Sequence, residues 1–425
     1  MKLTFDKVVV VGLGYIGLPT AAILASREVD VVGVDIDQHA VDTINRGRIH
    51  IVEPDLDTIV SAVIMSGKLR AAAIPEKADA FLIAVPTPFM ESNKPDISYV
   101  ESATRSIAPV LQKGCLVVLE STSPVGTTEL MSRWLAESRS DLTFPHQNGE
   151  NADVQIAHCP ERVLPGHILK ELTQNDRVIG GLTQYCAQRA ESFYKIFVEG
   201  ECIITNSKTA EMCKLTENAF RDVNIAFANE LSIICDKLKI NVWELIELSN
   251  RHPRVNILQP GPGVGGHCIA VDPWFIINSA PQEAKLIRVA REINDAKPLH
   301  LIDQILKLTS SVSDASIAFF GFTYKPNIDD VRESPSLEIV NTVTKRLPCV
   351  EILVVEPYVK ELTSQLRGAP NARLVGVEEA LDKANILVLL VDHDIFHDIP
   401  VDRLAGKQII DSRGCWTRML GKVDI

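Results

Sequence analysis

The sequence is short of positive charge, of paired cysteines and of long unbroken hydrophobic runs. It has 43 Lys and Arg against 55 Asp and Glu in 425 residues, a formal net charge of −12. Nucleic-acid-binding proteins usually carry a basic patch or stripe, so this balance argues against a nucleic-acid partner. The nine cysteines form no Cys-x-x-Cys pair, and such a pattern is typical of a reducing compartment rather than of a disulfide framework. We therefore predict a cytoplasmic protein that acts on small molecules.

An uninterrupted membrane-spanning segment is also missing. The apolar stretch from Val8 to Ser26 approaches the ~20 residues that a spanning helix needs, but three glycines and Pro19 interrupt it. Glycine and proline both disfavour a continuous helix. We interpret the stretch as a strand, a turn and a helix, with no signal peptide and no membrane association.

Short β-branched runs alternate with helical stretches in the first and last parts of the chain. The runs expected to form strands lie at 8–11, 29–36, 80–86, 115–121 and 154–160, and again at 315–322, 350–357, 385–393 and 407–412. Such apolar runs are typical of parallel sheets that helices cover on both faces. Residues 205–252 contain neither Gly nor Pro, and their helical spacing predicts a long helix to about Lys239, with further helices over 242–250 and 282–309. We predict α/β domains over 1–204 and 313–425, joined by a helical connector over 205–312.

A glycine-rich turn follows the first predicted strand. The sequence GLGYIG matches G-x-G-x-x-G, and the next strand ends in Asp35, 18 residues after its last glycine. This context favours a dinucleotide, with backbone N–H groups on the pyrophosphate and the carboxylate on the ribose hydroxyls. A carboxylate would repel a 2′-phosphate, so NAD is favoured over NADP. FAD and a turn needed only for packing are the alternatives. The residues assigned to the cofactor at this turn are Gly12, Gly14, Tyr15, Ile16 and Gly17.

Polar residues form a stripe along one face of the long predicted helix. Glu211, Lys214 and Asn218 recur at helical spacing, and either Arg221 or Asp222 continues the stripe. A lysine in a cleft can act as a base or bind an oxyanion. A solvent-facing stripe on an amphipathic helix is the alternative interpretation.

Other candidates follow predicted strands, where open α/β sheets bind ligands. Glu161 in HCPERVLPG and Thr122 in LESTSPVG come directly after apolar runs, although turn or capping roles would also explain them. Lys325 and Arg332 follow the first strand of the second α/β domain. Both could contact phosphate, or they are solvated surface cations.

One thiol stands in a glycine-rich stretch, GPGVGGHCIAVDP. Cys268 at the start of a helix would have a lowered pKa, and Asp272 lies four residues on. A thiolate can trap an aldehyde as a thiohemiacetal, whose oxidation gives a thioester that water hydrolyses. A buried, inert cysteine is the alternative.

A metal site is not predicted. His-Cys pairs occur at 158–159 and 267–268, and HDIFH spans 393–397, and His and Cys side chains are residue types that bind zinc. The chain has no Cys-x-x-Cys pair, and HDIFH lacks the glutamate of H-E-x-x-H.

Seven motifs together resemble the UDP-glucose/GDP-mannose dehydrogenase family in order and spacing along essentially the whole chain. They are GLGYIG, PTP, STSPVG, PERVLPG, EMCKLTENAFRDVNIAFANE, GVGGHCIAVDP and KPNIDDVRESP. The resemblance implies two Rossmann-like, doubly wound domains joined by a long central helix, a homodimer, and oxidation of a nucleotide-sugar alcohol to an acid with two NAD⁺. The first domain would bind NAD, the connector would dimerise and the last domain would bind the UDP-sugar.

The glycine loop resembles the family branch that acts on UDP-N-acetylhexosamines. Across its length the chain resembles bacterial enzymes that convert UDP-N-acetyl-D-mannosamine to its uronic acid, a precursor of surface polysaccharide such as enterobacterial common antigen. Oxidation of the gluco epimer, UDP-N-acetylglucosamine, is one alternative. A non-catalytic nucleotide-sugar sensor is another.

The resemblance also implies residue roles. Cys268 would be the nucleophile, Lys214 or a water held by Asp272 the first base, and Asn218 would stabilise an oxyanion together with Lys214. Glu161 would activate the hydrolytic water, which Thr122 would help to position. Further cofactor contacts would come from Thr87, Thr122 and Arg332. Substrate contacts would come from Glu161, Arg162, Lys214, Asn218, Arg254, Gly265 and Lys325, with Arg254 preferred over Arg251 as a residue that reaches a neighbouring subunit.

Overall fold

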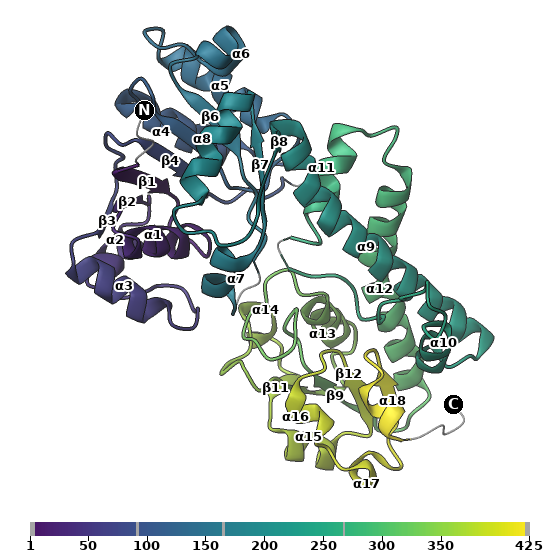
Figure 1. The fold of residues 1–425 in the computed structure, drawn as a ribbon. Coiled ribbons are helices and arrows are strands. Elements are labelled where there is room, and N and C mark those ends of the chain that lie inside the picture. The colour runs from purple at the N-terminus through teal and green to yellow at the C-terminus, as the bar shows by residue number, and fades with distance from the viewer. Residues whose placement is uncertain (1–4, 91–92, 164–165, 267, 421–425) are drawn as a thin grey trace. The chain divides into compact units, whose positions relative to one another are not determined.

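The computed structural model describes residues 5–90, 93–163, 166–266 and 268–420 (Figure 1). Its chain forms two compact units, and each is built around its own β-sheet. Unit 1 comprises Met1–Glu217 and Trp274–Pro281, and unit 2 comprises Asn218–Pro273 and Gln282–Ile425. The two sheets confirm the predicted α/β class with two doubly wound domains.

Unit 1 contains an eight-stranded sheet with the order β3-β2-β1-β4-β5-β6-β7-β8. Its strands are β1 (Lys7–Val11), β2 (Asp30–Val34), β3 (Leu69–Ala72), β4 (Ala80–Ile83), β5 (Leu116–Leu119), β6 (Gln155–His158), β7 (Arg177–Gly181) and β8 (Cys202–Asn206). The first six strands are parallel and follow the strand order of dinucleotide-binding domains, in which ligands bind where the order reverses, here between β1 and β4.

The four valines of β1 explain why this strand was evident from sequence. Val8 and Val10 pack into one hydrophobic cluster, while Val9 and Val11 pack into another. Successive side chains of a strand point to opposite faces, so the sheet is buried on both sides and its strands are apolar throughout. The turn after β1 and helix α1 (Gly17–Ser26) break the apolar stretch as predicted. Among the described residues, no helix is both long enough and apolar enough to cross a membrane.

Strands β3, β7 and β8 were not predicted, and the sheet is not wholly parallel. β7 pairs antiparallel with β6, and β8 then runs parallel to β7. The missed strands carry polar residues or glycine, as in LRAA, RVIGG and CIITN. β3 and β8 are the edges of the sheet, and β8 is only half-buried. β7 lies inside the sheet, but it begins with Arg177 and ends in two glycines, so it also lacks the apolar run on which the prediction depended.

Unit 2 contains a wholly parallel sheet with the order β11-β10-β9-β12-β13. Its strands are β9 (Ser316–Phe320), β10 (Glu351–Val355), β11 (Ala372–Leu374), β12 (Ile386–Leu389) and β13 (Gln408–Asp411). Four of the five were predicted, and the short, half-buried β11 was not. The order reverses between β9 and β12, which predicts a ligand site at the carboxyl ends of these two strands.

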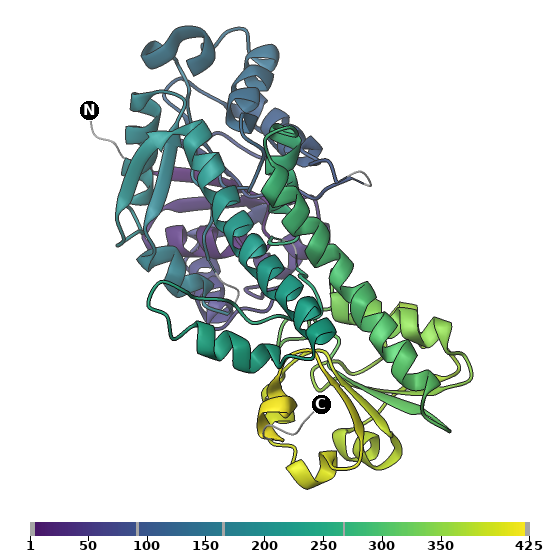
Figure 2. The same ribbon diagram turned by 90° about the vertical axis from the view of Figure 1, so that its right-hand side faces the viewer.

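Helices join the two sheets along the chain, as predicted. The long helix α9 (Ser207–Leu238) begins in unit 1 and continues into unit 2, which also contains α10 (Val242–Ser249) and α12 (Lys285–Ser310). Helix α11 (Asp272–Ser279) begins in unit 2, but most of it belongs to unit 1. Figure 2 displays α9 beside α12, and buried polar side chains join them, such as Asn229 and Asn294. Pro298 lies inside α12.

Candidate functional site

The glycine turn after β1 has room for a ligand at one glycine only. A Cβ at Gly12, where φ is +92°, would lie 2.5 Å from the Ala84 carbonyl oxygen, and a Cβ at Gly17 would lie 1.8 Å from that of Gly12. Both glycines are therefore required by packing within the protein. A Cβ at Gly14 would meet nothing within 4 Å. That open space beside bare backbone at the start of α1 fits a pyrophosphate group.

Asp35 lies just past β2 and holds the glycine turn. Its carboxylate accepts hydrogen bonds from the backbone N–H groups of Leu13 at 2.8 Å and of Asp37 at 2.9 Å. Each carboxylate oxygen keeps a second acceptor position, so ribose hydroxyls can still bind. Sequence reasoning missed Ile36 and Ile74, which are 93% and 76% exposed just past the neighbouring strands β2 and β3. Two exposed apolar side chains here would suit the faces of an adenine ring, and the position of Ile36 next to Asp35 was the available signal.

Replacing Asp35 with arginine is expected to weaken NAD⁺ binding by at least about tenfold, because the ribose acceptors and the bond to Leu13 are both lost. Titration of NAD⁺ by calorimetry measures the change. Asp37→Arg is the matched control, because it makes the same change of charge two residues on. Asp37 is exposed and caps helix α2 (Gln38–Asn45). Equal NAD⁺ affinity in wild type and Asp35→Arg would contradict the ribose contact.

Thr87 and Thr122 lie together at the carboxyl ends of β4 and β5. The Thr87 hydroxyl donates a 2.6 Å hydrogen bond to the Thr122 carbonyl. Because β4 is the strand beside the glycine turn, this pair lies on the ligand edge of the sheet. Tyr15 is 39% exposed and Ile16 is half-buried, so side chains of the turn itself are also accessible.

Glu161 follows β6 and is bound to protein groups on both oxygens. It accepts from the Arg162 N–H at 2.6 Å and from Arg177 Nη1 at 2.7 Å. The carboxylate is 7% exposed and the guanidinium 1%. Burial by itself would lower the pKa of Arg177, but the charge of Glu161 outweighs it and the pKa is raised well above its usual range. A role for Glu161 in activating water therefore requires its second acceptor positions or a change of partner.

Two ion pairs and two polar contacts join the loop of Glu161 to its surroundings within unit 1. The Arg162 guanidinium binds Glu217 on α9 with N–O distances of 2.6 and 3.2 Å. Glu53 accepts from the N–H groups of Gly166 and Ile168, both at 2.8 Å. The loop is thus fixed by side chains far away in the sequence, and spacing along the chain gave no signal for Glu53 or Arg177.

A second buried carboxyl, Glu120, lies beside Glu161 and was missed. It directly follows β5, and the Tyr194 hydroxyl donates to it at 2.7 Å. Its other oxygen is buried without a hydrogen-bond partner among the described residues. Burial and then the charge of Glu161 raise the pKa of Glu120 to about 7. Its place in LESTSPVG, two residues before Thr122, was the available signal.

Glu120→Gln is expected to stabilise the protein more at pH 7.5 than at pH 5. The folded pKa of Glu120 is about 7 and its ordinary value is 4.5. The folded state therefore holds this proton while the unfolded state loses it, so wild-type stability falls as pH rises through this window, by about 3 kcal/mol in all. Glutamine has no such proton. Melting temperatures of both proteins at the two pH values measure the difference.

The control for that experiment is Glu199→Gln, the same change at a side chain that is 67% exposed in the same unit. Its effect on melting temperature should not depend on pH. If the difference in melting temperature between Glu120→Gln and the wild type were the same at pH 5 and pH 7.5, Glu120 would not hold a proton in the folded state.

The polar stripe of α9 is buried, so the solvent-facing interpretation is wrong for most of it. Glu211 is 1% exposed, Asn218 7% and Asp222 0%, while Arg221 is exposed and does not belong to the stripe. Glu211 accepts from the N–H groups of Gly126 and Thr128 at the start of α5 (Thr127–Ser138). Lys214 is half-buried and has no ion pair with another described residue. Lys214 and Asn218 therefore lie on one face of α9, where Lys214 is half-buried and Asn218 is buried.

Asp272 and Asn218 are brought together in unit 2. The Asn218 amide donates a 2.5 Å hydrogen bond to the Asp272 carboxylate, and both side chains are buried. Helix α11 begins at Asp272, so the prediction that Cys268 starts a helix is wrong. Cys268 instead lies in an exposed turn, and its carbonyl accepts from the N–H groups of Val271 and Asp272. The thiol is accessible, which excludes the buried, inert alternative.

The glycines before Cys268 are explained first by packing within unit 2. A Cβ at Gly265 would lie 2.5 Å from the Glu333 carbonyl oxygen, and one at Gly266, where φ is +83°, would lie 3.0 Å from the Tyr324 ring. At Gly263 it would meet Pro335 at 2.9 Å. The loop therefore lies tightly against residues 324–335, and the expectation that these glycines serve mainly to admit a ligand to the backbone is replaced by close contact between two protein loops.

A buried polar network holds both ends of this loop. Asn229 on α9 accepts from the Gly261 N–H at 2.9 Å, and Arg291 on α12 donates to the Ile269 carbonyl at 3.5 Å. Arg291 also binds Asp222 at 2.5 Å, and both side chains are fully buried. Burial raises the pKa of Asp222 to about 6. Helices α9 and α12 thus fix the segment that carries Cys268.

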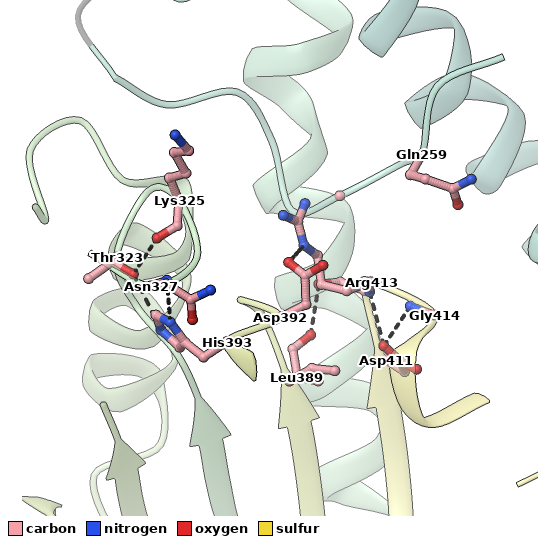
Figure 3. A network of polar contacts seen from close by, with 12 residues as sticks. Gln259, Thr323, Lys325, Asn327, Leu389, Asp392, His393, Asp411, Arg413 and Gly414 are labelled. Carbon is pink, nitrogen blue, oxygen red and sulfur yellow. Dashed lines mark hydrogen bonds and ion pairs between the residues drawn. The ribbon is translucent and has the colours of Figure 1, made fainter. Parts of the chain in front are cut away.

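Lys325 lies at the carboxyl edge of the second sheet, as predicted. Its side chain extends away from the strands (Figure 3) and has no ion pair with another described residue. Near it, Arg413 follows β13 and binds Asp392 at 2.8 Å. Sequence reasoning missed Arg413, although it follows a predicted strand. Lys325 follows β9, one of the two strands at the reversal of strand order, where an anionic ligand is expected, and Arg413 follows the next strand after β12.

Arg332 and Arg254 are both exposed in unit 2. The Arg332 guanidinium binds Asp330 through two N–O contacts of 2.7 and 2.9 Å. Arg254 has no ion pair with another described residue, whereas Arg251 lies 4.0 Å from Glu247. A role for Arg332 at the cofactor would thus compete with its bond to Asp330.

No group of three or more His, Cys, Asp or Glu side chains is placed to hold a metal ion in the part of the chain that the structure describes. His267 lies outside the described residues. In HDIFH, His393 is buried and binds Glu356, while His397 is exposed. The two histidines therefore do not share a surface.

Three family models match the chain in consecutive order. They are the NAD binding domain of the UDP-glucose/GDP-mannose dehydrogenase family over residues 6–198, its central domain over 208–296 and its UDP binding domain over 318–418. The chain is 60% identical to UDP-N-acetyl-D-mannosamine dehydrogenase of Escherichia coli K12, covering 97% of this chain and 100% of that one. It is also 60% identical to NDP-N-acetyl-D-galactosaminuronic acid dehydrogenase of Ralstonia solanacearum, covering 98% of each. Among solved structures, UDP-N-acetyl-mannosamine dehydrogenase Cap5O of Staphylococcus aureus matches with a TM-score of 0.84 and 42% identity over 96% of this chain and 95% of that one.

Proposed function

The chain belongs to the UDP-glucose/GDP-mannose dehydrogenase family, whose members oxidise nucleotide sugars with NAD, and from that premise we propose that its substrate is UDP-N-acetyl-D-mannosamine. The product would be UDP-N-acetyl-D-mannosaminuronic acid, formed by a four-electron oxidation at C6. The observation that carries the chemistry is the exposed thiol of Cys268 on a loop held at both ends by buried side chains. The name and identity of the Escherichia coli relative support the choice of sugar.

NAD⁺ supplies the hydride acceptor, and the described residues fit it. Gly14 leaves bare backbone for the pyrophosphate, Asp35 keeps acceptors for the ribose, and Ile36 with Ile74 would flank the adenine. Thr87 and Thr122 would contact the rest of the cofactor from the ends of β4 and β5. The Asp35 carboxylate disfavours a 2′-phosphate at this position.

In the first step a base would take the proton of the C6 hydroxyl, and the C6 carbon would give up a hydride, for which bound NAD⁺ would be the acceptor. Lys214, half-buried and without an ion-pair partner among described residues, is one candidate base, and a water held by Asp272 is the other. Asn218 lies one turn after Lys214 on α9, and its amide is held by Asp272 at 2.5 Å. Lys214 and Asn218 would both stabilise the developing alkoxide, because each donates hydrogen bonds to an anionic oxygen.

In the second step the Cys268 sulfur adds to the aldehyde carbon, and the thiol proton passes to the aldehyde oxygen. The resulting thiohemiacetal would lose its hydroxyl proton to a base and the hydride of its carbon, for which a second NAD⁺ would be the acceptor, and this would leave a thioester. Water then attacks the thioester carbonyl, the C–S bond breaks and the thiolate is released with the carboxylate product. Glu161 would take the proton from that water, and Thr122 would help to position it.

The nucleotide part of the substrate would bind at the second sheet. Lys325 would contact its phosphates from the end of β9, with Gly265 and Arg162 as further substrate contacts. Arg332 would contribute to the cofactor after release from Asp330. Arg254 would reach the substrate of a neighbouring subunit, which fits an exposed guanidinium that has no ion pair among the described residues.

We further propose a homodimer. Phe220, Phe227 and Ile234 follow one another at intervals of seven on α9 and are 67%, 54% and 46% exposed. Apolar side chains at this spacing form one helix stripe, which a second copy would cover. Sedimentation equilibrium distinguishes dimer from monomer. The cytoplasm is the proposed location, because none of the nine cysteines, all of them among the described residues, forms a disulfide in the structure.

The galacto isomer is the second candidate substrate. A relative of equal identity is named for an N-acetyl-D-galactosaminuronic acid product. The manno, galacto and gluco isomers all present the same C6 alcohol to the proposed chemistry. The residues described above therefore do not separate them, and the sugar must be tested directly.

The test is to count the NADH formed when excess NAD⁺ and purified protein consume a limiting amount of UDP-N-acetyl-D-mannosamine. About two NADH per sugar is expected, since each of the two oxidations yields one. One NADH per sugar would end the reaction at the aldehyde and remove the role of Cys268. No NADH from this sugar, with two from the galacto or gluco isomer, would assign the other substrate.

A further inference from the structure

His393 is fully buried at the carboxyl edge of the second sheet, between the ends of three neighbouring strands. It follows β12 by four residues, and Glu356 directly follows β10. β12 and β10 flank β9 on opposite sides. The His393 Nε2 atom lies 3.1 and 3.2 Å from the two Glu356 carboxylate oxygens. These two side chains therefore meet beside the loop that leaves β9.

The loop that leaves β9 is held by this pair along its backbone. The N–H groups of Phe322 and Thr323 donate to Glu356 at 2.8 and 3.2 Å. The Asn327 N–H donates to His393 Nδ1 at 2.9 Å (Figure 3). Asn327 has φ of +63°, a left-handed conformation that few residue types adopt. Its side-chain oxygen accepts from the Asp394 N–H and the Tyr358 hydroxyl, each at 3.1 Å.

Lys325 lies between Thr323 and Asn327, whose backbone N–H groups are bound by Glu356 and His393. The Thr323 hydroxyl donates to the Lys325 carbonyl at 3.0 Å and lies 3.4 Å from His393 Nε2. Thr323 is fully buried, and its contact with His393 is shielded from water. The backbone of Lys325 is therefore fixed from both sides, while its ammonium group extends from the sheet without an ion pair among the described residues.

The hydrogen bonds also indicate which tautomer the His393 imidazole adopts. Nδ1 accepts the Asn327 N–H and so carries a lone pair, which places the ring proton on Nε2, toward Glu356. Only a ring with an acceptor at Nδ1 and a donor at Nε2 satisfies both partners. An apolar side chain of similar volume would fill the space but would leave the Asn327 N–H and the Glu356 carboxylate buried without this partner.

We infer that His393 is a positioning residue which, with Glu356 and Thr323, sets the Lys325 ammonium to bind the diphosphate of the nucleotide sugar. This inference rests on the proposed role of Lys325 in substrate binding. A lysine on a free loop would lose backbone and side-chain entropy when it binds a phosphate, and a loop fixed in advance avoids the backbone part of that loss. His393 itself does not touch the ligand in this scheme. Its effect passes through the Asn327 N–H.

The test separates the two hydrogen bonds of His393 by two substitutions. The side-chain amide of asparagine reaches the place of Nδ1, and that of glutamine reaches the place of Nε2. His393→Asn should keep the acceptor for Asn327 and bind UDP nearly as well as wild type. His393→Gln should keep a donor to Glu356, lose the bond to Asn327 and bind UDP about tenfold more weakly. Calorimetry with UDP as the probe, on the full-length protein, measures both.

Two further measurements distinguish positioning from loss of structure. His397→Gln is the matched control, the same change four residues on at an exposed site, and it should leave UDP binding unchanged. NAD⁺ affinity should remain at the wild-type value in all variants. If His393→Gln does not fold, Thr323→Val removes the hydroxyl that binds the Lys325 carbonyl with little change in volume, and a similar loss of UDP affinity is expected.

The variant Lys325→Met tests separately whether Lys325 contributes to UDP binding. It therefore distinguishes failure of the positioning role of His393 from failure of the proposed substrate site. Lys325→Met and His393→Gln are each expected to weaken UDP binding. If the double variant then binds UDP as well as Lys325→Met does, His393 and Lys325 act through one contact and the inference holds. If Lys325→Met weakens binding but His393→Gln and Thr323→Val do not, positioning by His393 is overturned and the proposed substrate site stands. If Lys325→Met binds UDP as wild type does, the assignment of Lys325 fails and the inference fails with it.

Discussion

Replacing Cys268 with serine is expected to lower the formation of uronic acid by at least about a thousandfold, because a serine hydroxyl is not ionised near neutral pH and is a far weaker nucleophile than a thiolate. Cys268 is exposed, so the substitution leaves no cavity and NAD⁺ affinity should not change. Acid formation from the limiting sugar is measured together with NADH. The largest effect should fall on the second oxidation, which needs the covalent adduct.

Cys349→Ser is the matched control for that experiment. Cys349 is the other exposed thiol of unit 2, and its replacement should leave both oxidations at the wild-type rate. Protection of Cys268 from alkylation by bound substrate would support the same conclusion independently. Production of the acid by Cys268→Ser at the wild-type rate would rule out the thioester route, while leaving the family and the cofactor unaffected.

Arg291→Met is expected to reduce the free energy of unfolding by about 3–5 kcal/mol, the cost of leaving a buried charge without its partner. Arg291 and Asp222 are both 0% exposed and lie 2.5 Å apart between α9 and α12. The Asn294 amide, 2.8 Å away, would be the main remaining donor to the Asp222 carboxylate. One Asp222 oxygen already has no hydrogen-bond partner among the described residues. Urea denaturation followed by circular dichroism measures the loss.

The double variant Asp222→Asn with Arg291→Met should recover part of that stability, because it removes the uncompensated charge. Arg367→Met is the control, the same change at a guanidinium that is 65% exposed, and its effect should stay within about 0.5 kcal/mol. If Arg291→Met were as stable as the control, the pair would not hold the two helices together. Its activity is a second readout, since Arg291 also binds the carbonyl of Ile269, next to Cys268.

The sequence was informative wherever local chemistry dictates structure. Four valines buried on two faces identified β1, and the turn GLGYIG with Asp35 identified the dinucleotide edge, because glycines and a following carboxylate act within one βαβ unit. The absence of Gly and Pro from 205–252 predicted the long helix α9. Strands β3, β7, β8 and β11 escaped because polar or edge positions do not give a continuous apolar run.

The candidate site was only partly predictable, because contacts between distant residues decide which side chains meet. Cys268, Lys214, Asn218 and Asp272 were selected from sequence, but nothing in their spacing showed that Asn218 and Asp272 are 2.5 Å apart. Glu120, Arg177 and Glu53 were missed, since their roles arise from burial beside or behind the Glu161 loop.

The glycines of GPGVGGHC illustrate the same division. Their number alone indicated that backbone must come close to something, because a Cβ is excluded there. Only the tertiary structure identified what comes close, namely Tyr324, Glu333 and Pro335 of the neighbouring loop. Composition and motif order by themselves determined the fold class, the cofactor and the family. Tertiary structure decided which carboxyls are buried, which cations lack a partner among the described residues and which bonds hold the thiol loop, because burial and hydrogen-bond pairing depend on residues that only folding brings together.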